Sequence, residues 1–211
     1  MSVAPSAAIT GARVWRAAER GEESQGLLLL DRALKVVSFS GAGAALFDSA
    51  VAAERPLVLD ADGLNLLAGR AVALPAGSVI TPHPGEAARL LGCTTAQVQA
   101  DRFAAAREMA ERHGVAVVLK GAGSLVAAPG RLPRLVDAGN PGMAVGGMGD
   151  VLTGVVAALL AQGLDAFDAA SCGALLHACA GDLAAAEGER GLLPRDLMPA
   201  LRRLANPGGA S

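Results

Sequence analysis

Short apolar runs alternate with longer stretches of helical pattern along most of the chain. Apolar runs of strand length, bounded by polar residues, glycines or prolines, predict strands at residues 35–39, 57–59, 78–81 and 115–119. The stretches between and after them predict helices at residues 44–53, 63–67, 85–91, 95–113, 151–162, 166–188 and 194–204. Because continuous apolar runs suit parallel strands that are buried on both faces, the alternation predicts an α/β fold with a mainly parallel sheet.

Two segments after residue 120 follow other patterns. Residues 124–128 and 134–137 predict an antiparallel hairpin, and Pro129 and Gly130 between them are typical turn residues. Residues 139–149 are rich in glycine and predict a loop before the next helix.

The front of the chain gives the weakest pattern. Residues 1–35 contain at most one weak strand, at 27–30, and are left unassigned, so the domain is expected over residues 36–211. Buried parallel strands need neighbours on both sides. With so little ahead of residue 36, we expect an N-terminally truncated fold whose exposed apolar surface favours a homo-oligomer.

Polar or glycine-rich segments follow the predicted strands or open the next helix. In α/β sheets, ligands gather at the carboxyl ends of the strands, so these segments form the candidate site. They are DADGLN (60–65), TPHPGE (81–86), KGAGS (120–124) and GNPGMAVGGMGD (139–150).

Each candidate has a structural alternative. The glycines at 146–149 can bring backbone N–H groups to a phosphate, and the helix after them adds its N-terminal dipole. Asp150 is either a site residue or the cap of that helix. Lys120 either holds a nucleotide phosphate or is a solvated side chain that opens the hairpin. His83 is either a site residue or a surface histidine, and Glu86 either joins the site or only favours a helix dipole.

Asp60 and Asp62 lie two residues apart at a strand end. Paired carboxylates in this position can bind magnesium through water. Alternatively, one of them caps the following turn. We favour capping for Asp62 and leave the role of Asp60 open.

The composition excludes several classes of protein. Hydrophobic residues make up 52% and charged residues 18% of the chain, so it is not disordered, and the net charge of −2 indicates no basic surface for nucleic acid. The cysteines, Cys93, Cys172 and Cys179, lack the spacing of a zinc site or a disulfide framework. The longest apolar stretch, residues 151–161, is too short for a bilayer, and no signal-peptide pattern opens the chain. A cytoplasmic protein that binds neither nucleic acid nor membrane is expected.

Four motifs in a fixed order carry a resemblance to a known family. They are LDADGLNLL (59–67), ITPHPGEAARLLG (80–92), VVLKGAGSLVA (117–127) and GNPGMAVGGMGDVLTGVVAALLAQG (139–163), and residues 177–204 continue the likeness. Over about residues 56–204, the chain resembles the ADP-dependent NAD(P)H-hydrate dehydratases, a branch of the ribokinase-like superfamily. The resemblance implies a ribokinase-like three-layer sandwich and a lyase that repairs nicotinamide nucleotides.

The resemblance also implies a reaction. The family phosphorylates the hydroxyl of hydrated NADH or NADPH from ADP, with Mg²⁺, and the phosphate then leaves to restore the reduced cofactor. Such a transfer depends on positioning and charge neutralisation. A functional coupling to an NAD(P)H-hydrate epimerase is also implied.

The family pattern assigns roles to individual residues and assigns none of them as a metal ligand. Asp150 corresponds to the base that accepts the hydroxyl proton, and it also contacts the substrate with His83. Gly147 and Gly149 correspond to the anion hole. The adenine nucleotide site corresponds to Lys120, Gly121, Ala122, Gly123, Ser124 and Gly149.

Departures from the pattern keep two alternatives open. Val145 stands where the family usually has Ser or Thr, which removes a hydroxyl near the anion hole, whereas Ser124 keeps the hydroxyl of a common Thr. One alternative is another ribokinase-like small-molecule kinase, against which HPGE (83–86) and GNPGMA (139–144) argue. The other is a degenerate subunit that binds nucleotide without catalysis, which the missing front favours.

Overall fold

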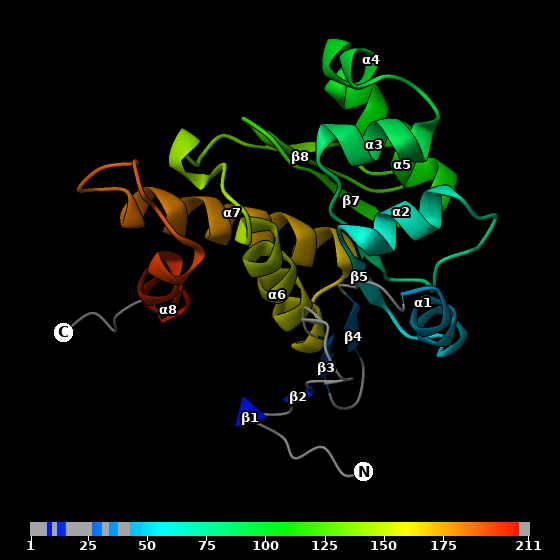
Figure 1. The fold of residues 1–211 in the computed structure, drawn as a ribbon, viewed down its shortest axis with the longest axis horizontal. Helices are drawn as coiled ribbons and strands as arrows, with labels where there is room; N and C mark the ends of the chain where they lie inside the picture. The colour runs from blue at the N-terminus through cyan, green and yellow to red at the C-terminus, as the bar shows by residue number, and fades with distance from the viewer. Residues whose placement is uncertain (1–7, 10–11, 16–26, 31–33, 38–42, 207–211) are drawn as a thin grey trace.

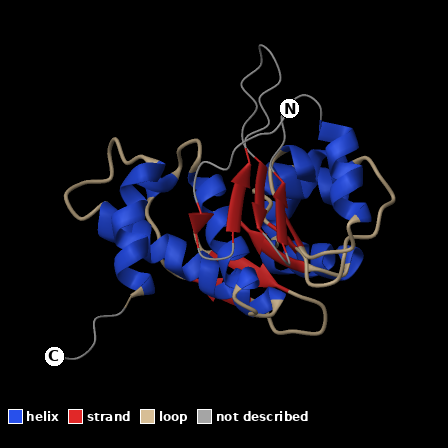
Figure 2. Cartoon of the chain, turned by 90° about the horizontal axis from the view of Figure 1, so that it is seen from below, coloured by secondary structure: helices blue, strands red, loops and turns tan. Residues whose placement is uncertain are grey.

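One mixed β-sheet lies between two layers of helices in the computed structural model, which describes residues 8–9, 12–15, 27–30, 34–37 and 43–206 (Figures 1 and 2). Within these residues, nine strands lie side by side in the order of the sequence. Pairing is parallel from β4 to β7 and antiparallel on either side of them. The strands are β1 (Ala8–Ile9), β2 (Ala12–Trp15), β3 (Leu27–Leu30), β4 (Leu34–Val37), β5 (Leu57–Leu59), β6 (Val79–Ile80), β7 (Ala116–Leu119), β8 (Ser124–Ala127) and β9 (Arg134–Val136).

The helices separate or follow the strands and cover both faces of the sheet (Figure 2). They are α1 (Gly43–Ala52), α2 (Asp62–Ala68), α3 (Pro84–Leu91), α4 (Thr95–Ala100), α5 (Arg102–His113), α6 (Met148–Ala161), α7 (Ala166–Ala184) and α8 (Leu197–Ala205), with the 3-10 turns η1 (Pro141–Met143) and η2 (Pro194–Asp196).

Alternate residues of the central strands face different helix layers. Leu57 and Leu59 of β5 pack in one core with residues of α1 to α5, whereas Val58 between them packs in a second core with residues of α6 and α7. All three side chains are fully buried. Continuous apolar runs are therefore the composition that these strands require. The expected α/β fold of three layers is confirmed.

The single helix predicted over residues 95–113 is two helices. α4 ends at Ala100 and α5 begins at Arg102, and Asp101 between them has φ −145° and ψ 85°. The Asp101 carboxylate accepts a hydrogen bond of 2.8 Å from Ala104 N and so caps α5. Hydrophobic periodicity continues through the junction, which is why the pattern alone predicted one helix.

The front of the chain holds more strands than the sequence indicated. The strand predicted at 27–30 is β3, and β1 and β2 precede it. β3 pairs antiparallel with β4, with Leu29 opposite Lys35. The sheet therefore continues for three strands beyond β4. Of the strand predicted at 35–39, β4 contains the part up to Val37, and residues 38–39 lie outside the described residues.

Candidate active site

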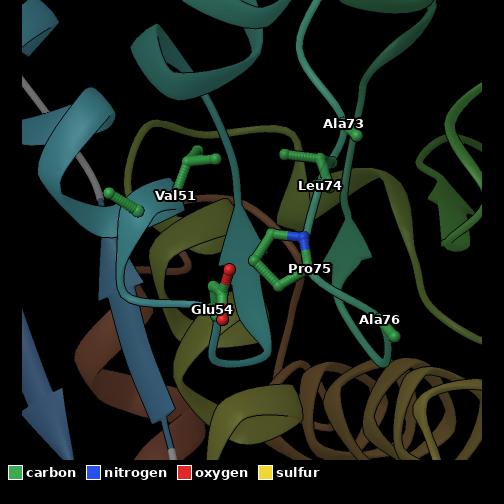
Figure 3. A pocket seen from close by; sticks show the side chains of 7 residues that line it. Val51, Glu54, Ala73, Leu74, Pro75 and Ala76 are labelled. Atoms are coloured by element: carbon green, nitrogen blue, oxygen red, sulfur yellow. The ribbon is translucent and has the colours of Figure 1, made fainter.

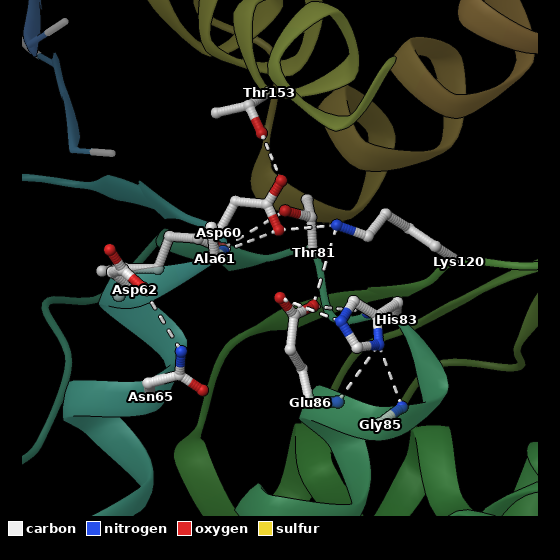
Figure 4. Close-up of polar contacts among 11 residues, drawn as sticks. Asp60, Ala61, Asp62, Asn65, Thr81, His83, Gly85, Glu86, Lys120 and Thr153 are labelled. Carbon is white, nitrogen blue, oxygen red and sulfur yellow. Dashed lines mark hydrogen bonds and ion pairs between the residues drawn. The ribbon is translucent and has the colours of Figure 1, made fainter. Parts of the chain in front are cut away.

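The polar residues that follow β5, β6 and β7 meet at one edge of the sheet, as Figure 4 shows. Parallel register places the carboxyl ends of these strands side by side. Lys120, directly after β7, donates its backbone N–H to Pro82 O at 2.8 Å. Its ammonium Nζ donates to Asp60 Oδ1 at 2.6 Å, across 60 residues of sequence. The predicted convergence of these strand ends is confirmed by this contact.

Asp60 is a buried partner of Lys120, with 3% of its surface exposed. Its Oδ1 also accepts from Ala61 N at 2.9 Å, and its Oδ2 accepts from Thr153 Oγ1 at 3.3 Å. A buried carboxylate needs such partners, since an unpaired charge in this position would be costly. The solvated alternative for Lys120 is therefore wrong, because its side chain is only 21% exposed and is ion-paired.

Asp62 does not share this environment. It is exposed, lies in the first turn of α2 and is within 3.4 Å of Asn65 Nδ2. The N-cap residue of α2 is Ala61, which makes no side-chain capping bond. The predicted capping role of Asp62 is therefore wrong, and the two aspartates do not form a paired site.

His83 and Glu86 are locked together at the start of α3 (Figure 4). His83 Nδ1 accepts from Gly85 N at 3.0 Å and from Glu86 N at 3.3 Å, while Glu86 Oε2 accepts from His83 N at 2.7 Å. This capping box leaves the ring proton on Nε2, which lies 3.4 Å from Glu86 Oε1. His83 is half exposed on a fixed ring, and Glu86 is buried within 3.8 Å of Lys120 Nζ. Glu86 therefore does more than favour a helix dipole.

The loop of residues 120–124 turns sharply through two glycines. Gly121 has φ +149° and Gly123 has φ +66°, values that side-chain-bearing residues rarely adopt. Ser124 Oγ donates to Gly121 O at 3.3 Å and closes the turn. Arg102 at the start of α5 reaches this loop and donates to Ala122 O at 2.6 Å. The sequence interpretation missed Arg102.

The 139–149 loop, a name that here includes Met148 and Gly149 at the start of α6, ends beside the Asp60–Lys120 pair. An added Cβ on Gly149 would lie 2.9 Å from Asp60 Oδ2 and 3.4 Å from Lys120 Nζ, so only glycine allows this approach. Gly147, with φ +88°, is the N-cap of α6 and makes no side-chain capping bond. Asp150 is the third residue of α6, so the alternative that it is only the cap is wrong.

The electrostatics of Asp150 connect it with the same pair. Asp150 is exposed to solvent on one side, yet surrounding protein atoms desolvate its carboxyl enough to raise its pKa; the negative charge of Asp60 raises this pKa further, and Lys120 opposes both effects. A carboxylate whose pKa is raised holds a proton more readily than an ordinary aspartate does. Such a group suits general base chemistry, in which it accepts a proton from a reacting hydroxyl.

Helix α7 supports the 139–149 loop with residues that the sequence interpretation did not single out. Asp182 accepts from Gly139 N at 2.9 Å and from Asn140 Nδ2 at 3.0 Å. Burial lowers the pKa of His177 to about 4, and the nearby backbone of Met148 opposes this shift. The two residues belong to HACAGD (177–182), and their separation of five residues turns the helix by about 140°, so they lie on different sides of α7. Their spacing gives no signal of a shared site, and only the packing of α7 against this loop reveals their role.

The site offers oxygen ligands rather than a dense metal cluster. In the described ranges, no group of three or more His, Cys, Asp and Glu side chains could hold a metal ion. The buried carboxylates of Asp60 and Glu86 share the single cation of Lys120. Carboxylate oxygens of this kind suit Mg²⁺ when phosphates and water complete its shell.

A separate cavity of about 470 Å³ lies between the end of α1 and the segment before β6 (Figure 3). It contains none of the site residues described above. The residues that line the cavity are Val51, Ala52, Glu54, Ala73, Leu74, Pro75 and Ala76.

None of the helices in the described part of the chain is long and apolar enough to cross a membrane.

Comparison with known proteins gives consistent matches. The model of the NAD(P)H-hydrate dehydratase family matches residues 40–203. The bifunctional NAD(P)H-hydrate repair enzyme Nnr of Escherichia coli K12 is 51% identical over 154 residues, which cover 72% of this chain and 30% of that protein. The ADP-dependent (S)-NAD(P)H-hydrate dehydratase of Neisseria meningitidis serogroup B is 48% identical over 160 residues, which cover 72% of this chain and 54% of that protein.

A solved structure gives the same result. The ADP/ATP-dependent NAD(P)H-hydrate dehydratase of Bacillus subtilis, co-crystallised with ATP/Mg²⁺, superposes with a TM-score of 0.68 at 32% identity, covering 75% of this chain and 57% of that one. The chain thus spans about a third to just over half of the length of these relatives.

Proposed function

Because the chain belongs to the NAD(P)H-hydrate dehydratase family, we propose that it uses ADP to dehydrate hydrated NADH and NADPH. The observation that carries this proposal is the meeting of Asp150, Lys120 and the two glycine-rich loops at one edge of the sheet. In the proposed reaction, the ring hydroxyl takes the terminal phosphoryl group of ADP, and AMP leaves. Phosphate then leaves the ring with its C–O bond electrons, a ring proton is lost, and the double bond of the reduced cofactor is restored.

Asp150 is the proposed base. Its carboxylate accepts the hydroxyl proton as the oxygen attacks the phosphoryl group. The raised pKa of Asp150, caused by desolvation of its carboxyl and by Asp60, supports this role. The backbone N–H groups of Gly147 and Gly149 at the start of α6 form the proposed anion hole for the transferring phosphoryl group.

In the proposal, the nucleotide and the hydrated cofactor bind on different sides of Asp150. His83, half exposed on a ring fixed by Glu86, contacts the hydrated cofactor. In the proposal, the ammonium of Lys120 neutralises nucleotide phosphate, and the Ser124 hydroxyl exchanges its 3.3 Å hydrogen bond to Gly121 O for one to phosphate or ribose. The proposed nucleotide site consists of Lys120, Gly121, Ala122, Gly123, Ser124 and Gly149.

Mg²⁺ fits the same edge. Asp60 and Glu86 would hold it with nucleotide phosphates and water. These two buried carboxylates carry two negative charges, and Lys120 supplies only one positive charge to balance them. The ion would supply charge neutralisation for the phosphoryl group. The residues of the chain itself orient the reactants, exclude water around Asp60 and move the hydroxyl proton to Asp150.

The proposal extends to partners and organisation. We assign the catalytic unit to residues 36–211 and propose a functional coupling to an NAD(P)H-hydrate epimerase, which the word bifunctional in the name of the Escherichia coli relative supports. Self-association, a cytoplasmic location and the lack of nucleic-acid binding stay predictions.

The test is an assay with purified protein, hydrated NADH, Mg²⁺ and ADP. We expect the near-ultraviolet absorbance of NADH to return only when ADP is present, and AMP and phosphate to form in equal amounts. Unhydrated NADH and a reaction without ADP serve as controls. Binding of ADP or AMP without any restored absorbance would contradict the proposal and favour a non-catalytic nucleotide-binding subunit.

A further inference from the structure

Arg102 lies behind the 120–124 loop and binds its backbone. Nη1 donates to Ala122 O at 2.6 Å, and Nη2 lies 3.3 Å from Leu119 O and 3.5 Å from Lys120 O. A guanidinium presents its donors in a rigid planar fork, so one side chain fixes three carbonyl groups together. An added Cβ on Gly121 would lie 2.9 Å from Nη2, so the arginine touches the loop directly.

These contacts set the direction of the amide groups in the loop. In a trans peptide unit, the C=O and the N–H point in opposite directions. The first unit shows the effect: Leu119 O faces Arg102, and Lys120 N–H points away to Pro82 O at 2.8 Å. By the same geometry, the N–H groups of Gly121 and Gly123 turn away from Arg102. Backbone N–H groups that converge on one side form a concave site for anions.

Arg102 also brings a positive charge that no carboxylate in the described part of the chain neutralises, since none lies within ion-pair distance of its guanidinium. Its Nε is buried without a hydrogen-bond partner in the same part of the chain. Burial lowers the pKa of Arg102, yet an arginine keeps its charge at neutral pH. A fixed positive charge behind the loop favours an anion in front of it.

We infer that Arg102 is a positioning residue that holds the 120–124 loop open for the phosphate of ADP without touching the nucleotide. The inference rests on the proposed use of ADP at this loop. Lys120 supplies positive charge beside the phosphate. Arg102 binds the carbonyl side of the loop and so fixes the direction of the loop N–H groups. A loop that is ordered before binding loses less conformational entropy on binding, so the effect of Arg102 is on affinity for the phosphate.

The test compares Arg102→Ala and Arg102→Lys with the control Arg112→Ala. Arg112 lies on the same helix and also donates to a backbone carbonyl, Leu90 O at 3.0 Å. We expect the calorimetric Kd for ADP to rise about tenfold in Arg102→Ala, with unchanged affinity for adenosine, which lacks phosphate. KM for ADP should rise while kcat stays near the wild-type value. Arg102→Lys should recover only part of the loss, because an ammonium cannot bind three carbonyls in one plane.

The outcomes separate this inference from the proposed function. Wild-type ADP affinity in Arg102→Ala, or full affinity in Arg102→Lys, overturns the inference and leaves the proposed function standing. The same loss in Arg112→Ala, or an equal loss for adenosine, indicates a general effect on stability and also overturns it. If Arg102→Ala does not fold, Arg102→Lys carries the comparison. Wild-type protein that binds no ADP overturns the proposed function itself.

Discussion

The two glycine-rich loops of the site are held in opposite ways. The 120–124 loop is held by a cation, since Arg102 donates to its carbonyl groups. The 139–149 loop is held by an anion, since Asp182 accepts from Gly139 N and Asn140 Nδ2. Binding the carbonyls leaves N–H groups facing a ligand. Binding the N–H groups at the start of a loop leaves its far end, at Gly149, to approach Asp60.

The contrast indicates that the two loops have different roles. The first arrangement suits the binding of phosphate, and the second suits a loop whose end positions the reacting group. We therefore expect changes in the 139–149 loop and its continuation in α6 to reduce the rate. Changes in the 120–124 loop should instead reduce the affinity for nucleotide.

The largest effect is expected for Asp150→Asn. An amide cannot accept the hydroxyl proton, so kcat should fall about 10²- to 10⁴-fold while the Kd for ADP stays nearly unchanged. Asp62→Asn is the matched control, because Asp62 is an exposed first-turn aspartate of another helix, and it should keep full activity. Steady-state kinetics and calorimetry measure the two quantities. A fully active Asp150→Asn protein would refute the assignment of the base.

His177 should make the support of the 139–149 loop sensitive to acid. Its pKa is about 4 in the folded protein against 6.5 in its ordinary state, so the unfolded chain binds the proton first as the pH falls. The contribution of neutral His177 to stability is therefore complete above about pH 6.5 and is lost between pH 6.5 and 4, by roughly 3 kcal/mol. Urea unfolding of wild type and His177→Gln at pH 7, 5 and 4 measures it. Equal pH dependence in both proteins would contradict the prediction.

Gly142→Ala should weaken the same loop from within. A Cβ at this position would collide with the backbone carbonyl oxygen of Glu189. A backbone atom cannot move aside as the end of a flexible side chain can. We expect a loss of about 1–3 kcal/mol of stability, the usual effect of overpacking, together with a slower rate and retained ADP affinity. Gly146→Ala in the same loop has nothing within 4 Å of its Cβ and should keep its stability in urea. Equal stability of the two variants would count against this explanation.

Lys120→Ala should have the smallest effect on the reaction and on ligand binding and the clearest dependence on salt, although the unpaired Asp60 will also lower the stability of the fold. Loss of the ammonium removes the charge beside the phosphate and leaves Asp60 without its ion-pair partner. We expect about tenfold weaker ADP binding at low ionic strength and a smaller difference at high salt, where charges are screened. Lys120→Arg keeps the charge and serves as the control. ADP affinity that is unchanged at every salt concentration would exclude Lys120 from the nucleotide site.

Sequence patterns predicted the parts of the site that follow strands. Apolar runs locate β5, β6 and β7, and the residues after them, Asp60, His83 and Lys120, lie together as expected. The residue pattern favoured capping for Asp62 and left the role of Asp60 open, but it could not show which of the two is buried. Only the packed structure shows that Asp60 is buried against Lys120 and Asp62 is exposed.

The supporting residues could not be predicted in this way. Arg102 and Asp182 act on loops that lie 17 to 20 and 42 to 43 residues away, and no local pattern encodes such distances. His177 reaches Met148 only because α6 and α7 pack together. The strands β1 and β2 are short, and their segment has no clear hydrophobic period. The hydrophobic pattern therefore could not predict them.

Asp101 is the N-cap of α5, and Arg102 is the first residue of that helix. Each residue turns an α-helix by about 100°, so one added residue within a continuous helix would rotate every later side chain out of place. Since α5 begins at its own cap, its orientation is independent of the length of α4. Insertions or deletions before Asp101 are therefore not transmitted to the arginine. A change in the length of residues 93–100 should therefore leave Arg102 in contact with the 120–124 loop, provided that Val98 keeps its place in the core.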